Sequence, residues 1–157
     1  MDIEYLADHS DVIPTIAQWA YKEWAYLHPE RTYAEVERLI AEGSNKEDMP
    51  ISLVAMFAGK VIGWAVLKAS DFKERPNLSP WLGGLYIEKQ HRRKGVGTRL
   101  VGEIEGLSAR RGVRKLFLVT DDAEEFYCDL GWSVRERTES KGVSVVVMEK
   151  DIAAGEA

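Results

Sequence analysis

Several features of secreted, membrane-spanning or metal-binding proteins are rare or missing in this sequence. Cysteine occurs once, at Cys128, so no internal disulfide can form and a reducing, cytoplasmic location is expected. No apolar run approaches the roughly 18 to 20 residues that a membrane-spanning helix needs, so no membrane partner is expected. The acidic start MDIEYLADHSD has no basic segment followed by an apolar run, so no signal peptide is expected. The three histidines, His9, His28 and His91, lack metal-ligand spacing, and we expect no metal.

The overall composition is that of an ordinary globular protein. The chain has 157 residues, of which 45% are hydrophobic and 30% are charged. This balance excludes a collagen-like, coiled-coil or wholly disordered chain and leaves enough apolar side chains for a core. We expect one domain over residues 1–152, followed by a frayed tail at 153–157.

Charge is distributed unevenly along the chain. Residues 1–88 carry 8 Lys or Arg against 14 Asp or Glu, whereas residues 89–115 carry 9 against 2. An acidic half beside a short basic block indicates ligands of opposite sign, and a solvated basic helix face is the alternative. Nucleic acid is not expected as a partner, because the net charge is -5 and no basic stripe is interleaved with aromatic residues.

Hydrophobic periodicity predicts a mixed order of strands and helices, roughly βααβββαβαββ. Strands are predicted near residues 3–6, 51–57, 61–67, 81–87, 115–120, 132–138 and 143–150. Helices are predicted over 11–27, after Thr32, from Thr98 onward and shortly after Asp122. This order is typical of one mixed α/β domain.

Local patterns add detail at four places. Ser10 and the pair Asp121-Asp122 are predicted to cap helices, and Thr32 with Glu35 matches a capping box. Gly83-Gly84 interrupts the strand at 81–87, where paired glycines indicate a bulge or a close backbone approach.

The basic, glycine-containing segment Arg92–Thr98 lies between a predicted strand and a predicted helix. Its glycines allow close backbone approach, and free N–H groups at a helix start attract anions, so the segment suits a phosphate or pyrophosphate. Leu100 stands where a dinucleotide fingerprint has its third glycine, and there is no Gly-Lys-Ser/Thr sequence. A loose glycine turn without a ligand is the alternative.

Two motifs give the sequence a family resemblance. The run LYIEKQHRRKGVGTRL at 85–100 resembles the acyl-CoA-binding motif of the GNAT N-acyltransferase superfamily, Gln/Arg-x-x-Gly-x-Gly/Ala at a helix start. The run FYCDLGW at 126–132 is similar to that family's aromatic-Tyr-x-x-Leu-Gly-aromatic pattern near the C-terminus. The two motifs stand in the family's order, with one strand and one helix start between them.

The resemblance implies a fold and a cosubstrate. The fold is α/β (α+β), a single-domain GNAT-like fold. It has a mixed, mostly antiparallel sheet of about seven strands flanked by helices and splayed between 81–87 and 115–120. The cosubstrate is acetyl-CoA, without a metal. The backbone of Leu85 and Ile87 would pair with pantetheine, and the pyrophosphate would be held by the loop residues Arg92, Arg93, Lys94, Gly95, Val96, Gly97 and Thr98.

The resemblance also implies direct acyl transfer, in which an amine attacks the thioester. Tyr127 matches the family's general acid for the CoA thiolate, with a simple core aromatic as the alternative. The general base is open. Some relatives use a Glu on the strand that corresponds to 81–87, which has no acid here, so Glu88 is the candidate. Glu23, Asp71 and Glu74 are further acids on the acceptor side.

The acceptor is the least defined part of the prediction. We expect a small cationic primary amine, contacted by Trp24 and Trp81, because aromatic residues and an acidic surface attract cations. The alternative for Trp24 is a core residue. Peptide N-termini or lysine side chains remain alternative acceptors. Alternatives of another class are a non-catalytic CoA-binding regulatory module, a nucleotide-phosphate binder and a scaffold without a ligand. Relatives are often dimers, so a homodimer is possible.

Overall fold

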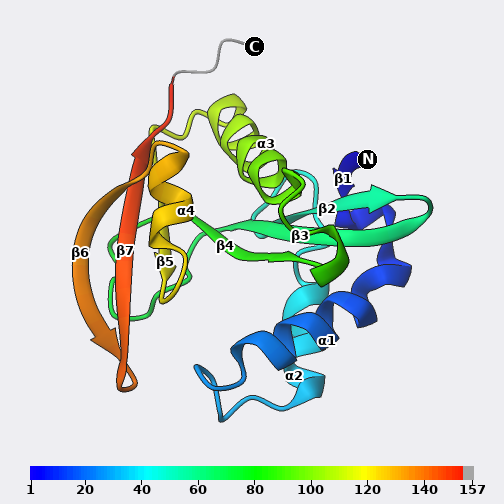
Figure 1. Ribbon diagram of the computed structural model, residues 1–157, viewed down its shortest axis with the longest axis horizontal. Coiled ribbons are helices and arrows are strands. Elements are labelled where there is room, and N and C mark those ends of the chain that lie inside the picture. The colour runs from blue at the N-terminus through cyan, green and yellow to red at the C-terminus, as the bar shows by residue number, and fades with distance from the viewer. Residues whose placement is uncertain (154–157) are drawn as a thin grey trace.

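The computed structural model describes residues 1–153, which form one mixed sheet with helices on both sides (Figure 1). The strands are β1 (Asp2–Tyr5), β2 (Ile51–Phe57), β3 (Lys60–Lys68), β4 (Trp81–Ile87), β5 (Lys115–Thr120), β6 (Ser133–Ser140) and β7 (Val143–Asp151). The helices are α1 (Ile13–Trp24), α2 (Tyr33–Ala41), α3 (Val96–Arg110) and α4 (Glu124–Asp129). The tail expected at 153–157 lies outside the described residues except for Ala153.

Within residues 1–153 the sheet has the strand order β1-β2-β3-β4-β5-β7-β6, and only the β4–β5 pair is parallel. This confirms the predicted seven-stranded, mostly antiparallel sheet. It also confirms the predicted splay between the strands at 81–87 and 115–120. The two central strands pair at a single register position, Trp81 with Phe117, and then diverge. In Figure 1, β2 to β4 consequently run at a steep angle to β5 to β7.

A bulge in β4 accompanies the divergence. Trp64 pairs with Tyr86 and Val66 pairs with Gly83, so β4 has one more residue than β3 across this interval. Gly84 lies within the bulge and has a φ of +61°, a conformation that glycine adopts without steric cost. The bulge predicted from Gly83-Gly84 is confirmed.

Helices cover the two faces of the sheet with separate cores. On one face, Leu100, Val101 and Ile104 of α3 pack in a cluster that includes residues of β2 to β5. On the other face, α1 and α2 contribute Ile16 and Ile40 to a cluster around β2 and β3. Among the described residues, no helix combines the length and the apolar character needed to cross a membrane.

The predicted helix starts were partly correct. The Thr32–Glu35 capping box is present, since Glu35 N–H donates to Thr32 Oγ1 at 3.2 Å. Ser10 is not a cap, because it begins a short 3₁₀ turn and α1 starts at Ile13.

The start of α4 also differs from the prediction. No aspartate caps it, because Ala123 is the N-cap residue and makes no side-chain cap bond. The hydroxyl oxygen of Thr120 instead accepts a hydrogen bond from Ala123 N–H at 3.0 Å.

Candidate active site

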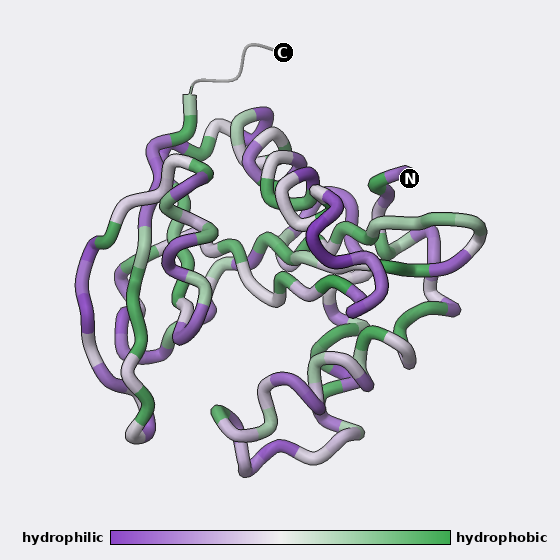
Figure 2. Tube along the Cα trace, in the orientation of Figure 1, coloured by the Kyte–Doolittle hydropathy of each residue, from purple (hydrophilic) through white to green (hydrophobic). Residues whose placement is uncertain are grey.

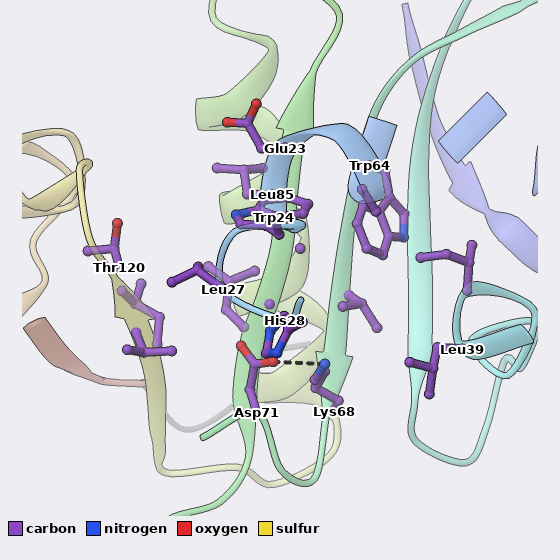
Figure 3. Close-up of a pocket in the computed structure, with 18 of the residues that line it drawn as sticks. Glu23, Trp24, Leu27, His28, Leu39, Trp64, Lys68, Asp71, Leu85 and Thr120 are labelled. Carbon is purple, nitrogen blue, oxygen red and sulfur yellow. Dashed lines mark ion pairs between the residues drawn. The ribbon is translucent and has the colours of Figure 1, made fainter. Parts of the chain in front are cut away.

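A cavity of about 580 Å³ opens where β4 and β5 separate. Its walls come from α1, α2, β3, β4, β5 and the start of α4, and they include Trp24, Leu85 and Tyr127. Figure 3 shows that side chains from these distant segments face a common space. The bulge and the splay of the sheet are therefore the features that make room for a ligand.

The basic loop lies between β4 and α3, and Figure 2 shows it as a hydrophilic stretch. Two of its residues have left-handed backbone conformations, with φ of +64° at Arg93 and +82° at Gly95. Gly95 is the N-cap residue of α3, so the helix begins at Val96, two residues earlier than predicted. The loop thus turns abruptly and presents the first-turn N–H groups of a 15-residue helix at an exposed surface.

Arg92 connects the loop to the end of β4 through its side chain. Its Nε–H donates to the carbonyl oxygen of Ile87 at 2.8 Å, and its guanidinium lies 5.1 Å from the centre of the Tyr86 ring. These contacts tie the loop to the end of β4. Arg93 and Lys94 are exposed, so their charges are available to an anion.

The structure brings the two sequence motifs together. A Cβ added to Gly97 at the start of α3 would lie 3.4 Å from the Phe126 ring of α4. Phe126 in turn packs edge-on against Tyr127, with 5.0 Å between ring centres. An anion on the loop and a reacting group beside Tyr127 would thus lie on adjoining parts of one surface.

Tyr127 is held firmly and remains protonated at neutral pH. Its side chain is 7% exposed, packs against Trp132 with 6.0 Å between ring centres, and lines the cavity. Burial, and then the negative charges of Asp122 and Asp71, raise the pKa of the phenol above its usual range. The phenol therefore keeps its proton at neutral pH and is available as a donor, although as a weaker acid than an exposed tyrosine, and it cannot act as a base there.

The charge of the cavity is negative. Two cations, Arg31 and Lys68, and five carboxylates line the cavity, which gives it a net charge of -3. The five carboxylates are those of Glu23, Glu42, Asp71, Asp121 and Asp122. His28 also lines the cavity, and its pKa is lowered by burial and then by Arg31 and Lys141. His28 is consequently neutral at pH 7 and does not offset the negative charge.

Aromatic side chains form one wall of this cavity. Trp24 lies edge-on to Trp64 and to Tyr86, with 6.4 Å between ring centres in each pair. Trp24 and Trp64 both line the cavity. Trp24 therefore lies in the cavity wall, and its contact with a substrate stays a prediction.

The prediction for Trp81 needs correction. Its side chain is fully buried among Phe72 and Phe117, and its indole N–H donates to the carbonyl oxygen of Leu78 at 2.6 Å. It does not line the cavity, so it supports the site through packing and does not contact an acceptor there.

The prediction for Glu88 also needs correction. Glu88 lies beyond the end of β4, 3.6 Å from His91, and lines a separate hollow beside Phe57. Its carboxylate therefore does not face the cavity that contains Tyr127, which argues against its role as the base.

His28 and Lys68 are two of the cavity residues that sequence reasoning did not assign to the site. His28 was weighed as a metal ligand and not as a cavity residue, and Lys68 was not singled out. Both line the cavity, where Lys68 Nζ lies 2.8 Å from Asp71 Oδ1 (Figure 3). The run of apolar and aromatic residues before His28 was a usable signal, because it places the residue shortly after a packed helix. Within residues 1–153, no group of three or more His, Cys, Asp or Glu side chains has the arrangement of a metal site.

Solved structures with the same fold are acetyltransferases. An aminoglycoside 6'-acetyltransferase type Ii is 22% identical, with a TM-score of 0.76 and 97% of each chain covered. An aminoglycoside 6'-N-acetyltransferase complexed with coenzyme A is 19% identical, with a TM-score of 0.76 over the whole of both chains. A phosphinothricin acetyltransferase from Sinorhizobium meliloti, in complex with AcCoA, is 18% identical, with a TM-score of 0.72, covering 99% of this chain and 90% of that one.

The sequence itself also matches a family. No curated protein sequence matches the chain. The model of the acetyltransferase (GNAT) family, however, matches residues 13–132, which include the loop before α3 and the Tyr127 motif. The chain belongs to the GNAT family and is an acyl-CoA-dependent N-acetyltransferase.

Proposed function

We propose that this protein transfers the acetyl group of acetyl-CoA to a small cationic primary amine by direct attack of the amine on the thioester. The observation that carries the proposal is an acidic cavity with aromatic walls that opens directly onto Tyr127 and the β4 bulge. A cavity of about 580 Å³ lies within the usual range for small-molecule sites, which favours a compact acceptor over a folded protein.

The loop before α3 is the proposed site of the CoA pyrophosphate. Its support is the exposed helix start, the left-handed turn at Gly95 and the adjacent charges of Arg93 and Lys94. A pyrophosphate bound there receives backbone hydrogen bonds and the positive end of the helix dipole. The pantetheine arm would then enter the gap beside Leu85 and Ile87, where β4 no longer pairs with β5.

The chemistry needs an oxyanion stabiliser and a proton donor. Backbone N–H near Leu85 lies at the cavity wall beside the bulge and is the proposed donor to the developing oxyanion. Tyr127 is the proposed acid that protonates the CoA thiolate as the tetrahedral intermediate collapses. A cation bound in the cavity would oppose the effect of Asp71 and Asp122 on Tyr127, and so would lower its pKa and ease that proton transfer.

The proposed acceptor follows from the charge of the cavity. A net charge of -3 attracts ammonium groups, and the indole rings of Trp24 and Trp64 can lie against them. Solved structures with this fold include aminoglycoside 6'-acetyltransferases, so aminoglycosides and linear polyamines are the first compounds to test.

Calorimetric titration with acetyl-CoA, CoA and ATP tests the cosubstrate. We expect a micromolar Kd for acetyl-CoA and CoA, or about -8 kcal/mol. Gly95→Glu should abolish binding, because it places a negative charge and a strained left-handed residue at the anion site. Gly102→Glu is the matched control, since Gly102 is exposed on the same helix with open space around it, and it should bind like the wild type.

The acceptor is tested next, with a panel of cationic, neutral and anionic primary amines assayed for CoA thiol release. Cationic amines should give the highest kcat/KM, and high salt should reduce that advantage. Absence of CoA binding, or ATP binding as tight as CoA binding, would overturn the cosubstrate proposal. Equal rates for cationic and anionic amines would overturn the acceptor proposal.

A further inference from the structure

We propose that Asp71 is the carboxylate that binds the acceptor ammonium and takes up its proton, from a position directly over Gly83 of β4. The inference rests on the proposed function, because it assumes that an amine attacks a thioester beside the β4 bulge. It assigns the group that β4 itself does not supply, since Trp81–Ile87 contains no acidic residue.

The placement of Asp71 is set by contact with the strand. A Cβ built on Gly83 would lie 3.1 Å from Asp71 Oδ2 and 3.3 Å from Asp71 Cγ. The carboxylate of a residue beyond the end of β3 therefore occupies the volume that a side chain of β4 would fill. Leu85, whose backbone lies at the proposed oxyanion site, is only two residues farther along the strand, and all three residues line the cavity.

Lys68 fixes the direction of this carboxylate. Lys68 Nζ contacts Asp71 Oδ1 at 2.8 Å, which leaves Oδ2 as the oxygen against Gly83. The Asp71 side chain is 23% exposed, so it remains reachable from the cavity. Figure 3 shows the pair on the cavity wall beside His28. One oxygen is thus committed to the protein, and the other is free for an ammonium group.

The other acids of the cavity are placed less favourably. Asp121 accepts a hydrogen bond from the Tyr26 hydroxyl, while Glu23 lies in α1 and Glu42 at the C-terminal end of α2, so neither is shown in contact with the strand at the bulge. Asp122 is the nearest rival, because it also acts on Tyr127. It is an exposed residue after β5, however, so water screens its charge.

The proton balance of the step is complete. The substrate ammonium has three N–H protons and the amide product keeps one. The first is transferred to Asp71 and then to water, which frees the nitrogen lone pair for attack on the carbonyl carbon. A C–N bond forms, the C–S bond breaks, and the thiolate takes the proton of Tyr127. The second proton leaves the nitrogen through water and restores Tyr127.

The test compares two nucleophiles in wild type, Asp71→Asn, Asp122→Asn and Glu74→Gln. One is the best ammonium substrate of the panel, and the other is an O-alkyl hydroxylamine of similar shape, which is uncharged at pH 7. For Asp71→Asn we expect kcat/KM to fall by about 100-fold or more with the ammonium substrate and by less than about 3-fold with the hydroxylamine. Glu74, the other acid of this loop that the sequence suggested, is exposed and does not line the cavity, so Glu74→Gln should change neither rate.

A relocation variant covers the case in which Asp71→Asn does not fold. The double change Asp71→Gly with Gly83→Asp moves the carboxylate from the loop to β4, into the volume that Asp71 vacates. With the ammonium substrate, we expect kcat/KM of this double variant to be at least about 10-fold higher than that of Asp71→Gly alone. Acetyl-CoA affinity should stay unchanged in every variant, because the loop before α3 is untouched.

Results other than those expected for the Asp71 variants would contradict specific parts of the inference. Equal losses with both nucleophiles would show that Asp71 only supports the loop, and a larger loss in Asp122→Asn would assign the role to Asp122. No loss in Asp71→Asn, or no recovery on relocation, would overturn the inference while the proposed function stands. If wild type binds acetyl-CoA but acetylates no amine, the proposed function fails and the inference fails with it.

Discussion

Substitution of Gly84 by alanine tests whether the β4 bulge depends on glycine. Gly84 has a φ of +61°, and a Cβ added there would lie 2.3 Å from the Trp64 ring. That ring is 5% exposed, and its Nε1–H donates to Ser52 Oγ at 3.1 Å, so it has little freedom to move. Alanine therefore meets both an unfavourable backbone conformation and an immobile neighbour.

The loss of stability expected for Gly84→Ala is the sum of a backbone contribution and a packing contribution. A left-handed conformation costs a residue with a Cβ about 1 kcal/mol, and overpacking in a core costs about 1 to 3 kcal/mol. Gly84→Ala should thus lower the free energy of unfolding by about 3 kcal/mol. Gly59 has a φ of +77° with nothing within 4 Å of an added Cβ, so Gly59→Ala should cost only about 1 kcal/mol.

Thermal and urea unfolding measure the difference between the two variants. For a chain of this size, 1 kcal/mol corresponds to about 2 to 4 °C in Tm, so Gly84→Ala should unfold about 4 to 8 °C below Gly59→Ala. Both substitutions restrict the unfolded chain equally, so that contribution cancels. Equal Tm values for the two variants would refute the argument that Trp64 confines the bulge.

Three further changes test other parts of the structure. Tyr127→Phe should lower kcat by about 100-fold if Tyr127 is the proposed donor to the thiolate, and transient kinetics would locate the loss in the chemical step. Ser52→Ala leaves the buried indole N–H of Trp64 without its acceptor and should lower the free energy of unfolding by about 1 to 3 kcal/mol in urea titrations. Lys141 holds the pKa of Glu30 at about 2, so the stability from this pair is present at neutral pH and is lost as the pH falls from about 4.5 towards 2. Lys141→Met should flatten the pH dependence of stability in that window.

Each of these changes has its own control and its own refuting result. Tyr127→Phe should bind CoA like the wild type, and an unchanged kcat would exclude the phenol as the acid. Ser108→Ala is the control for Ser52, because Ser108 Oγ only donates to a helical carbonyl four residues earlier, so its loss should matter little. A pH profile of stability that is identical with and without Lys141 would contradict the reasoning on Glu30.

The sequence predicted those features that depend on neighbouring residues. The capping box at Thr32 and the bulge at Gly83-Gly84 are local, and both are present. The start of α3 was predicted at Thr98 but lies at Val96, because Gly95 turns the chain with a φ of +82°. Periodicity alone does not reveal such a turn.

The errors came from contacts between residues far apart in the chain. Trp81 is buried by Phe117, which follows it by 36 positions in the chain and pairs with it across the sheet. Asp71 was one acid among several in the sequence, and only the path of the loop after β3 places it against Gly83. Acidic residues are common on loops, so their spacing does not distinguish a surface charge from one in a cavity.

The divergence of β4 and β5 also affects how the domain is held together. Among residues 1–153, main-chain hydrogen bonding between β4 and β5 is confined to the start of β4, so a ligand in the gap could supply the main-chain hydrogen bonds that the two strands do not make with each other. A pantetheine arm carries two amide groups and can supply such hydrogen bonds. Cosubstrate binding should therefore stiffen the whole domain, slowing amide hydrogen exchange in β5 and β7, well beyond the residues that touch it. The protein between catalytic cycles would be the more easily opened form.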